Sequence, residues 1–282
     1  MQNNISIKQN EEKMLKVQFA ARIFYNKAEN LSYLAFVISF LLMFVIFIPD
    51  EYSVWLTKIL PFLMQVLCFV IIYIRDKYII KASNLRNYFD YFVLNIKSSN
   101  YSNSRVREIY EIAEENYKSR NDEFAIQSQN NGESKQPGVL DWYIIKEENN
   151  QIDAIYECQK QNIWWNSKME KFRFKLYSRV LIFLILVLIM IFVSKGFLEM
   201  ILSFSAILFL ISSQIINWYK YIVISYKISG AVEILDLSRN EDGILILQEY
   251  LIELRKVNLL HINLIHKKNA EILSKVFKEI TF

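Results

Sequence analysis

The side chains best suited to catalysis or metal binding, histidine and cysteine, are few in this chain and widely separated. His261 and His266 are five positions apart, so they do not share one face of a helix. No cysteine lies near them, although structural zinc sites take four histidine or cysteine ligands. Cys68 and Cys158 are too few for a disulfide framework. The sequence therefore predicts solvated histidines, two free thiols and no metal site.

Motifs for nucleotide hydrolysis or nucleophilic catalysis are also missing from the sequence. The five glycines form neither a G-x-x-x-x-G-K nor a G-x-G-x-x-G pattern, the arrangements that cradle phosphates in nucleotide-binding loops. No set of serine, histidine and aspartate or of cysteine and histidine stands out. We therefore expect a protein that is not an enzyme and that needs no cofactor.

A few cations and one tryptophan remain as candidates for binding a small ligand. Guanidinium and ammonium groups bind phosphate, and an indole ring can stack on a nucleobase. The candidates are Arg86, Arg105, Arg107 and Lys160, with Trp142 as the stacking surface. The competing interpretation of each is a solvated cation or a core aromatic, which is the more frequent case in proteins.

Four uncharged apolar blocks dominate the sequence and must position these side chains. Asp, Glu, Lys and Arg are absent from the blocks Leu31–Ile48, Ile59–Ile74, Val180–Val193 and Met200–Ile216. A helix over the first block would be about 27 Å long, close to the hydrocarbon thickness of a bilayer. The shorter blocks reach spanning length with aromatic flanks such as Trp55 and Tyr177. The pattern predicts four transmembrane helices arranged as two hairpins.

Lysine and arginine are distributed unequally around these four blocks. The short connections within the hairpins hold only Lys58 and Lys195. The outer flanks carry many more cations: Lys13, Lys16, Arg22, Lys27, Arg75, Lys77, Lys81, Arg86, Lys160, Lys168, Lys171, Arg173, Lys175, Arg179, Lys220, Lys227 and Arg239. Because cytoplasmic flanks are enriched in lysine and arginine, we expect both termini and the middle segment to face the cytoplasm.

The polar segments are predicted to be helical as well, which makes the expected fold an all-α membrane protein with a cytoplasmic helical bundle. Phe89, Phe92, Val93 and Ile96 follow helical spacing, and a helix from about Gln151 should continue into the third span. In the tail, one helical face is formed by Ile244, Leu247, Leu251 and Leu254. We expect this face to pack on the middle segment. The predicted divisions are an N-terminal helix (1–30), a first hairpin (31–74), a helical region (75–176), a second hairpin (177–219) and a helical tail (220–282).

Small and polar residues lie along one side of the fourth span. The members of this stripe that are candidates for pore lining or for helix packing are Ser203, Ala206, Ser213, Gln214 and Asn217, and Gln65 belongs to a weaker stripe on the second span. One interpretation is helix packing within a subunit. The other is that the stripe lines water in an assembly of several subunits, because four helices in one chain are too few to enclose a wide conduit.

The stretch CQKQNIWWNSKMEKFRF, residues 158–174, places paired tryptophans and a basic run just before the third apolar block. Such rings and cations suit a headgroup region and an anionic inner leaflet, so we favour a lipid bilayer over a nucleic-acid polymer as the partner. Together with LDWY at 140–143, the stretch resembles the SMODS-associated four-transmembrane effector family. The matching positions are Asp141, Trp142, Gln159, Asn162, Trp164, Trp165, Lys168 and Arg173.

This resemblance implies a function that the residues alone do not. In anti-phage systems of this kind, a partner nucleotidyltransferase senses infection and makes a cyclic nucleotide. The membrane effector then disrupts the bacterial inner (cytoplasmic) membrane, an abortive infection. The resemblance thus implies a homo-oligomeric, pore-forming effector that is triggered through its cytoplasmic region, with the matching residues as gating candidates. Two alternatives stay open: a membrane-anchored helical adaptor or scaffold, and a constitutive small ion channel.

Overall fold

The computed structural model describes residues 4–45, 48, 55, 59–96, 101–134, 136–145, 150–195, 197–257 and 263–281. These residues form helices and connections with no strand, which confirms the all-α prediction for the described part of the chain. The helices are α1 (Ile5–Gln9), α2 (Glu12–Leu42), α3 (Leu60–Val93), α4 (Asn103–Ser119), α5 (Asn121–Gln127), α6 (Gln151–Lys195), α7 (Phe197–Leu237), α8 (Glu241–Lys256) and α9 (Asn263–Thr281).

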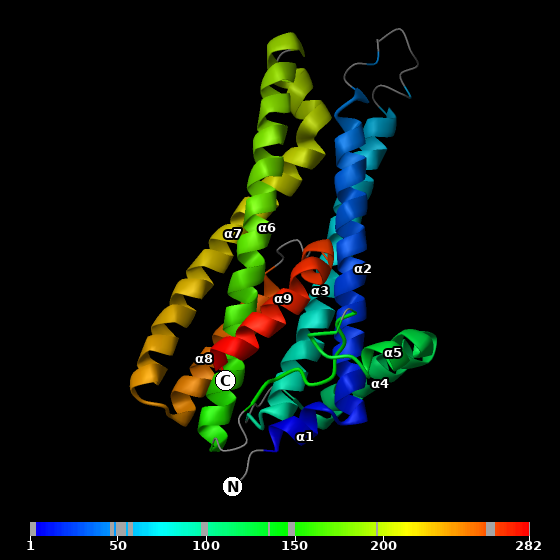
Figure 1. Ribbon diagram of the computed structural model, residues 1–282. Helices are drawn as coiled ribbons and strands as arrows, with labels where there is room; N and C mark the ends of the chain where they lie inside the picture. The colour runs from blue at the N-terminus through cyan, green and yellow to red at the C-terminus, as the bar shows by residue number, and fades with distance from the viewer. Residues whose placement is uncertain are drawn as a thin grey trace.

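Two pairs of long helices, α2 with α3 and α6 with α7, set the shape of the molecule. Figure 1 shows that both pairs extend in the same direction beyond the shorter helices, which gather around their other ends. Helix α6 alone has 45 residues and is therefore about 68 Å long at about 1.5 Å per residue. It runs without a break from Gln151 through the paired tryptophans into the third apolar block, as the sequence predicts.

The far halves of these helix pairs carry an extensive exposed apolar surface. Phe62 on α3, Ile182 on α6 and Ile215 on α7 are exposed, and Met190 and Val193 are 71% and 79% exposed. Among the described residues, one helical segment, Phe204–Leu237, has the length and apolar composition needed to cross a membrane. The four-span topology remains a prediction, and the predicted outside turn PDEYS (49–53) lies outside the described residues.

Helices α1, α4 and α8 share one hydrophobic core with the near ends of the long helices. Ile244, Leu247, Leu251 and Leu254 of α8 are all buried in it, which confirms the apolar face predicted for the tail. Helix α8 packs against α3, α6 and α7, so the tail does close on the middle segment. Asn240 starts α8 by accepting a hydrogen bond from the backbone N–H of Gly243 at 2.7 Å, as N-capping residues do.

The described segment between α5 and α6 is irregular but well bonded. The backbone N–H of Val139 donates to the carbonyl of Gln127 at 2.9 Å, and that of Leu140 donates to the carbonyl of Asn130 at 3.1 Å. Arg22 of α2 donates to the carbonyl of Pro137. These bonds fix the loop that leads into the LDWY sequence.

Candidate functional site

Asp141, the first gating candidate, lies in a turn that α1 holds in place. Its backbone adopts a φ of 48°, a left-handed conformation that is costly for a residue other than glycine. Asn10 offsets this cost with two hydrogen bonds, since its amide nitrogen donates to the Asp141 carboxylate at 2.7 Å and its oxygen accepts from the Asp141 backbone N–H at 3.0 Å. Asp141 is thus a loop-ordering residue and not a helix cap.

Two residues further on, Tyr143 is buried and bonded on three sides. Its backbone N–H donates to the side-chain oxygen of Gln9 at 2.7 Å, and its carbonyl accepts from the Gln9 amide at 3.2 Å. Its hydroxyl donates to the Asp90 carboxylate at 2.6 Å and accepts from the Asn162 amide at 2.9 Å. Burial, reinforced by the Asp90 charge, raises the pKa of Tyr143 well above its ordinary value.

Asp90, at the centre of this network, is fully buried. The Arg255 guanidinium of α8 lies 2.6 Å from its second carboxylate oxygen, and the Gln248 amide donates to the same oxygen at 3.3 Å. Arg255 also donates to the side-chain oxygen of Asn87 at 2.9 Å. Burial opposes the charge on Arg255, but Asp90 and Tyr143 outweigh it, so the pKa of Arg255 is raised. Such a buried pair is stable only because each partner satisfies the other.

Helix α6 joins the network through the glutamine and asparagine that precede the paired tryptophans. The Gln159 amide donates to the carbonyl of Ile244 and to the side-chain oxygen of Gln248, both at 3.1 Å. Asn162 bonds to Tyr143 as described, and the Gln161 amide donates to the carbonyl of Trp142 at 3.0 Å. The structure therefore brings Asp141, Trp142, Gln159 and Asn162 together, although they lie on different elements.

Several members of this network were not among the candidates from the sequence: Gln9, Asn87, Asp90, Tyr143, Gln248 and Arg255. The sequence did contain one sign that Asp90 is buried, because Asp90 lies between Phe89 and Tyr91 in a run of aromatic and apolar residues. A charge in such a run requires a buried partner, but the sequence does not say which one. The arrangement has no nucleophile or proton-transfer pair open to solvent. Its hydrogen bonds and its ion pair hold helices α1, α3, α6 and α8 together. We call this network the lock, and its members are Gln9, Asn87, Asp90, Tyr143, Gln159, Asn162, Gln248 and Arg255.

Arg86 lies at the edge of this lock, on α3. Its guanidinium carbon is 4.3 Å from the centre of the Trp142 ring and 5.8 Å from that of Tyr25. Its side chain is half-buried, yet its Nε is shielded from solvent and has no hydrogen-bond partner. Burial and the nearby Arg255 lower the pKa of Arg86, although Tyr25 and Asp90 partly oppose this effect. Of the four candidate cations, Arg86 is the one placed beside Trp142.

The other three candidate cations have different surroundings. Lys160 lies 3.6 Å from the Asp236 carboxylate and over the ring of Tyr156. Arg105 is exposed and lies over the ring of Tyr101, and Arg107 is exposed on α4. Their positions agree with the solvated-cation interpretation.

The paired tryptophans contact the C-terminal helix. The Trp164 ring is 5.9 Å from Trp165 and 5.1 Å from Phe277 of α9, measured between ring centroids. Lys168, one turn further along α6, lies 5.5 Å above the Trp164 ring. Trp164 therefore packs against another helix of the same chain, a contact that the expected headgroup environment did not include.

Near the start of the second hairpin, Arg173 and Glu170 form a buried ion pair one turn apart on α6. Both residues are only 7% exposed. Burial raises the pKa of Glu170, and Arg173 limits that rise. Arg173 belongs to the basic run that the sequence assigned to the anionic inner leaflet, but its side chain lies inside the molecule.

The polar stripe on α7 is partly used for packing within the subunit. Ala206 is 2% exposed and lies in a cluster with Ala35 of α2 and Cys68 of α3. Ser213 donates to the carbonyl of Leu210 at 2.8 Å. Gln214, Asn217 and Gln65 are half-buried. The side chain of Ser203 lies outside the described residues.

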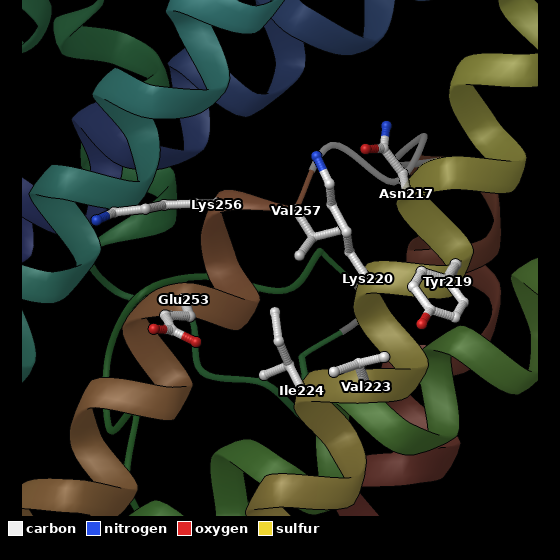
Figure 2. Close-up of a pocket in the computed structure, with 8 residues that line it drawn as sticks. All are labelled: Asn217, Tyr219, Lys220, Val223, Ile224, Glu253, Lys256 and Val257. Atoms are coloured by element: carbon white, nitrogen blue, oxygen red, sulfur yellow. The ribbon is translucent and has the colours of Figure 1, made fainter.

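A cavity of about 460 Å³ lies where α7 leaves the apolar region and meets α8. Figure 2 shows Val223 and Ile224 of α7 facing Glu253 of α8, while Lys256 extends away from α7. Lys220 and Tyr219 complete the α7 side of the cavity. Because Glu253 accompanies the two lysines, the charges that line this cavity are partly compensated.

Comparison with known proteins identifies one related family. The model of a family described as the SMODS-associating 4TM effector domain matches residues 3–213, which cover the first predicted hairpin, most of the second one (177–219) and the members of the polar network that precede α8. No curated protein and no solved structure matches the chain.

Proposed function

The chain belongs to the SMODS-associating 4TM effector family, and on that premise we propose that it is a pore-forming effector of a bacterial anti-phage system. It assembles as a homo-oligomer in the inner membrane, with both termini and the bundle in the cytoplasm. A cyclic nucleotide made by a partner nucleotidyltransferase triggers it through the cytoplasmic bundle. The triggered protein then opens a pore, and the infected cell dies.

The observation that carries this proposal is the continuity of α6. Gln159 and Asn162 fasten its first part to the lock, and the same helix continues as the apolar segment Val180–Val193. A helix transmits displacement along its length, so a change in the bundle reaches the hairpin without an intervening loop. A trigger must bind one arrangement of the bundle better than the other, because equal affinity shifts no population.

The exposed apolar surface supports a membrane location for the hairpins. Side chains such as Phe62, Phe183, Met190 and Val193 are exposed over the far halves of both pairs. Soluble monomers rarely expose such large contiguous apolar areas. In a membrane, the acyl chains of the lipids would cover this apolar surface and keep it out of contact with water.

Membrane potential measured in bacteria tests the proposal. We expect a potential-sensitive dye to report depolarisation within minutes when the protein is expressed together with its partner synthase. Trp164→Ala, which removes the contact with Phe277, should reduce this response while membrane insertion stays normal. Tyr226→Ala is the matched control, because Tyr226 is 83% exposed. Normal growth and an intact potential in the triggered wild type would refute pore formation.

A second candidate function is a membrane-anchored adaptor. It is favoured by the burial of Ala206 against α2 and α3, since a stripe used for packing is not available to line water. Replacing both apolar hairpins with unrelated spanning segments separates the two functions, because retained protection against phage would support the adaptor. Currents from purified protein in bilayers without a trigger would instead indicate a constitutive channel.

A further inference from the structure

The half-buried guanidinium of Arg86 lacks the hydrogen-bonding partners that its neighbours Arg22 and Arg255 have. Arg255 is bonded to Asp90 and Asn87, and Arg22 is bonded to Pro137 and Gln127. Arg86 makes ring contacts with Trp142 and Tyr25, and its shielded Nε makes no hydrogen bond. A desolvated donor without an acceptor costs free energy, and a bound anion is one partner that would remove this cost.

The charge around Arg86 is also unbalanced. Arg22 and Arg255 are both near enough to interact electrostatically with Arg86. The carboxylate that acts on Arg86 is Asp90, and this group is already engaged by Arg255 and by the Tyr143 hydroxyl. The carboxylate that acts on Arg22 is Glu123, whereas Arg86 and Arg255 share Asp90. Two guanidinium groups thus face one buried carboxylate, and the site carries an excess of positive charge.

Trp142 is fixed in position beside this excess charge. Its carbonyl is held by Gln161 of α6. Its neighbour Tyr143 is held by Gln9 of α1, and Asp141 is held by Asn10, the residue that follows α1. A guanidinium over an aromatic face keeps its N–H groups directed outward in its own plane, where they can bind an anion through two parallel hydrogen bonds. The indole and the Tyr25 ring would also suit a planar group attached to that anion.

The position of Arg86 along α3 argues for a soluble ligand. It lies 12 positions beyond Ile74, the end of the apolar block, which corresponds to about 18 Å along the helix. A lipid headgroup at the end of the block would not reach it. The cavity between α7 and α8 is nearer to the apolar region, and its lining includes the carboxylate of Glu253 as well as two lysines, which makes it less suited to an anion.

We propose that Arg86 and Trp142 form the binding site for the phosphate group of a small soluble nucleotide-like ligand, and that this site receives the trigger. This inference rests on the proposed function and adds the residues that recognise the ligand. The phosphate binds the Arg86 guanidinium and compensates the excess charge of Arg86 and Arg255. Because Gln161 holds Trp142, the bound ligand acts directly on α6, the helix that continues into the second hairpin.

Thermal unfolding of the full-length chain in detergent tests this assignment. The probes are inorganic phosphate, compared with chloride at equal ionic strength, and a 3′,5′-linked cyclic dinucleotide. We expect phosphate to raise the Tm of the wild type and of Arg107→Gln, an exposed control on α4. Arg86→Gln should bind phosphate about tenfold more weakly or worse, because a charge-assisted bidentate contact is lost. The cyclic dinucleotide should bind more tightly than phosphate and lose affinity in Trp142→Ala.

A second measurement separates binding from a structural role. Without ligand, Arg86→Gln should unfold at the same or a higher temperature than the wild type, because it removes an uncompensated buried charge. A clearly lower Tm would mean that Arg86 stabilises the bundle and would overturn the inference. An equal response to phosphate in Arg86→Gln and in the wild type would also overturn it. Arg86→Lys, which keeps the charge but not the planar fork, should retain only part of the phosphate response.

Two further comparisons identify the source of the phosphate and keep this inference distinct from pore formation. In lipid nanodiscs, exchanging phosphatidylcholine for phosphatidylglycerol should shift the wild type and Arg86→Gln equally, and an Arg86-dependent shift would assign the site to lipid. Depolarisation of triggered cells by Arg86→Gln at the wild-type rate would overturn the ligand site and leave pore formation intact. If binding depends on Arg86 but triggered wild-type cells do not depolarise, the ligand site is supported and pore formation is overturned.

Discussion

Replacing Asp90 with asparagine is the most direct perturbation of the lock between the helices. The amide has nearly the same shape as the carboxylate, so packing is preserved while the charge is lost. Arg255 would then be left buried with Asn87 as its remaining described polar partner, and the Tyr143 hydroxyl would donate to a neutral oxygen. The change thus isolates electrostatics from volume.

The expected loss of stability follows from the burial of both charges. Asp90 is fully buried and the side chain of Arg255 is 7% exposed, so solvent does not screen the pair. Removing one member of a buried ion pair costs about 3–5 kcal/mol, because the other charge is left uncompensated. At about 2–4 °C per kcal/mol for a chain of this size class, Asp90→Asn should lower the Tm by roughly 6–20 °C.

The assay is a double-mutant cycle on the full-length protein in detergent, with unfolding followed by tryptophan fluorescence. The variants are Asp90→Asn, Arg255→Met and the double substitution, and Glu108→Gln on the exposed face of α4 is the control. Because the double variant leaves neither charge unpaired, it should be destabilised by less than the sum of the two single variants. We expect a coupling free energy of about 2–3 kcal/mol.

Two results would refute this reasoning. The first is a Tm for Asp90→Asn within 2 °C of the wild-type value. Such a difference corresponds to a loss of less than about 1 kcal/mol in the free energy of unfolding and would mean that solvent reaches the pair. Additive effects in the cycle would mean that Asp90 and Arg255 do not interact directly. Either result would also remove the lock as an explanation of how the bundle holds α6.

Four further outcomes are expected. Gly138→Ala should lower the Tm by several degrees, because a Cβ there would lie 1.9 Å from the carbonyl oxygen of Asn130, and an unchanged Tm would show that the loop adapts freely. Asn240→Ala should cost about 1 kcal/mol in chemical unfolding, since the bond from the Gly243 backbone N–H is lost, whereas Asn240→Asp should restore most of it. Cys158 is fully buried and burial raises its pKa, so a maleimide should label it only after unfolding, and rapid labelling of the native protein would contradict its position. Because the folded state holds this proton more tightly than the unfolded chain does, stability should fall as the pH rises above about 8.5, which a comparison of Tm at pH 8 and pH 10 would show.

The helices were largely predictable from the sequence because their signals are local. Helical spacing of Ile244, Leu247, Leu251 and Leu254 marked the buried face of α8, and all four side chains are buried. The absence of glycine and proline between Gln151 and Lys195 agrees with one continuous helix, which α6 is. Each of these features depends on residues within a few turns of one another.

The candidate site was predictable only in part. Asp141, Trp142, Gln159 and Asn162 were identified through the family resemblance, and the structure places them in or beside the lock. Their partners were not identified, because neither Asp90 nor Arg255 shows from the sequence which opposite charge it meets. Trp164 was expected among headgroups, but its contact with Phe277 depends on how α9 folds back, which periodicity does not specify.

The sequence by itself determined which segments are helical, which faces are apolar and on which side of a membrane the cations are expected. Those properties follow from the period of the helix and from the transfer free energy of side chains, and both act over short stretches of chain. The tertiary structure alone decided that Gln248 meets Asp90, 158 positions away, and that Arg255 meets Asn87, 168 positions away. Such pairings depend on the packing of whole helices, since a buried polar group must find its partner wherever the fold brings one within about 3 Å.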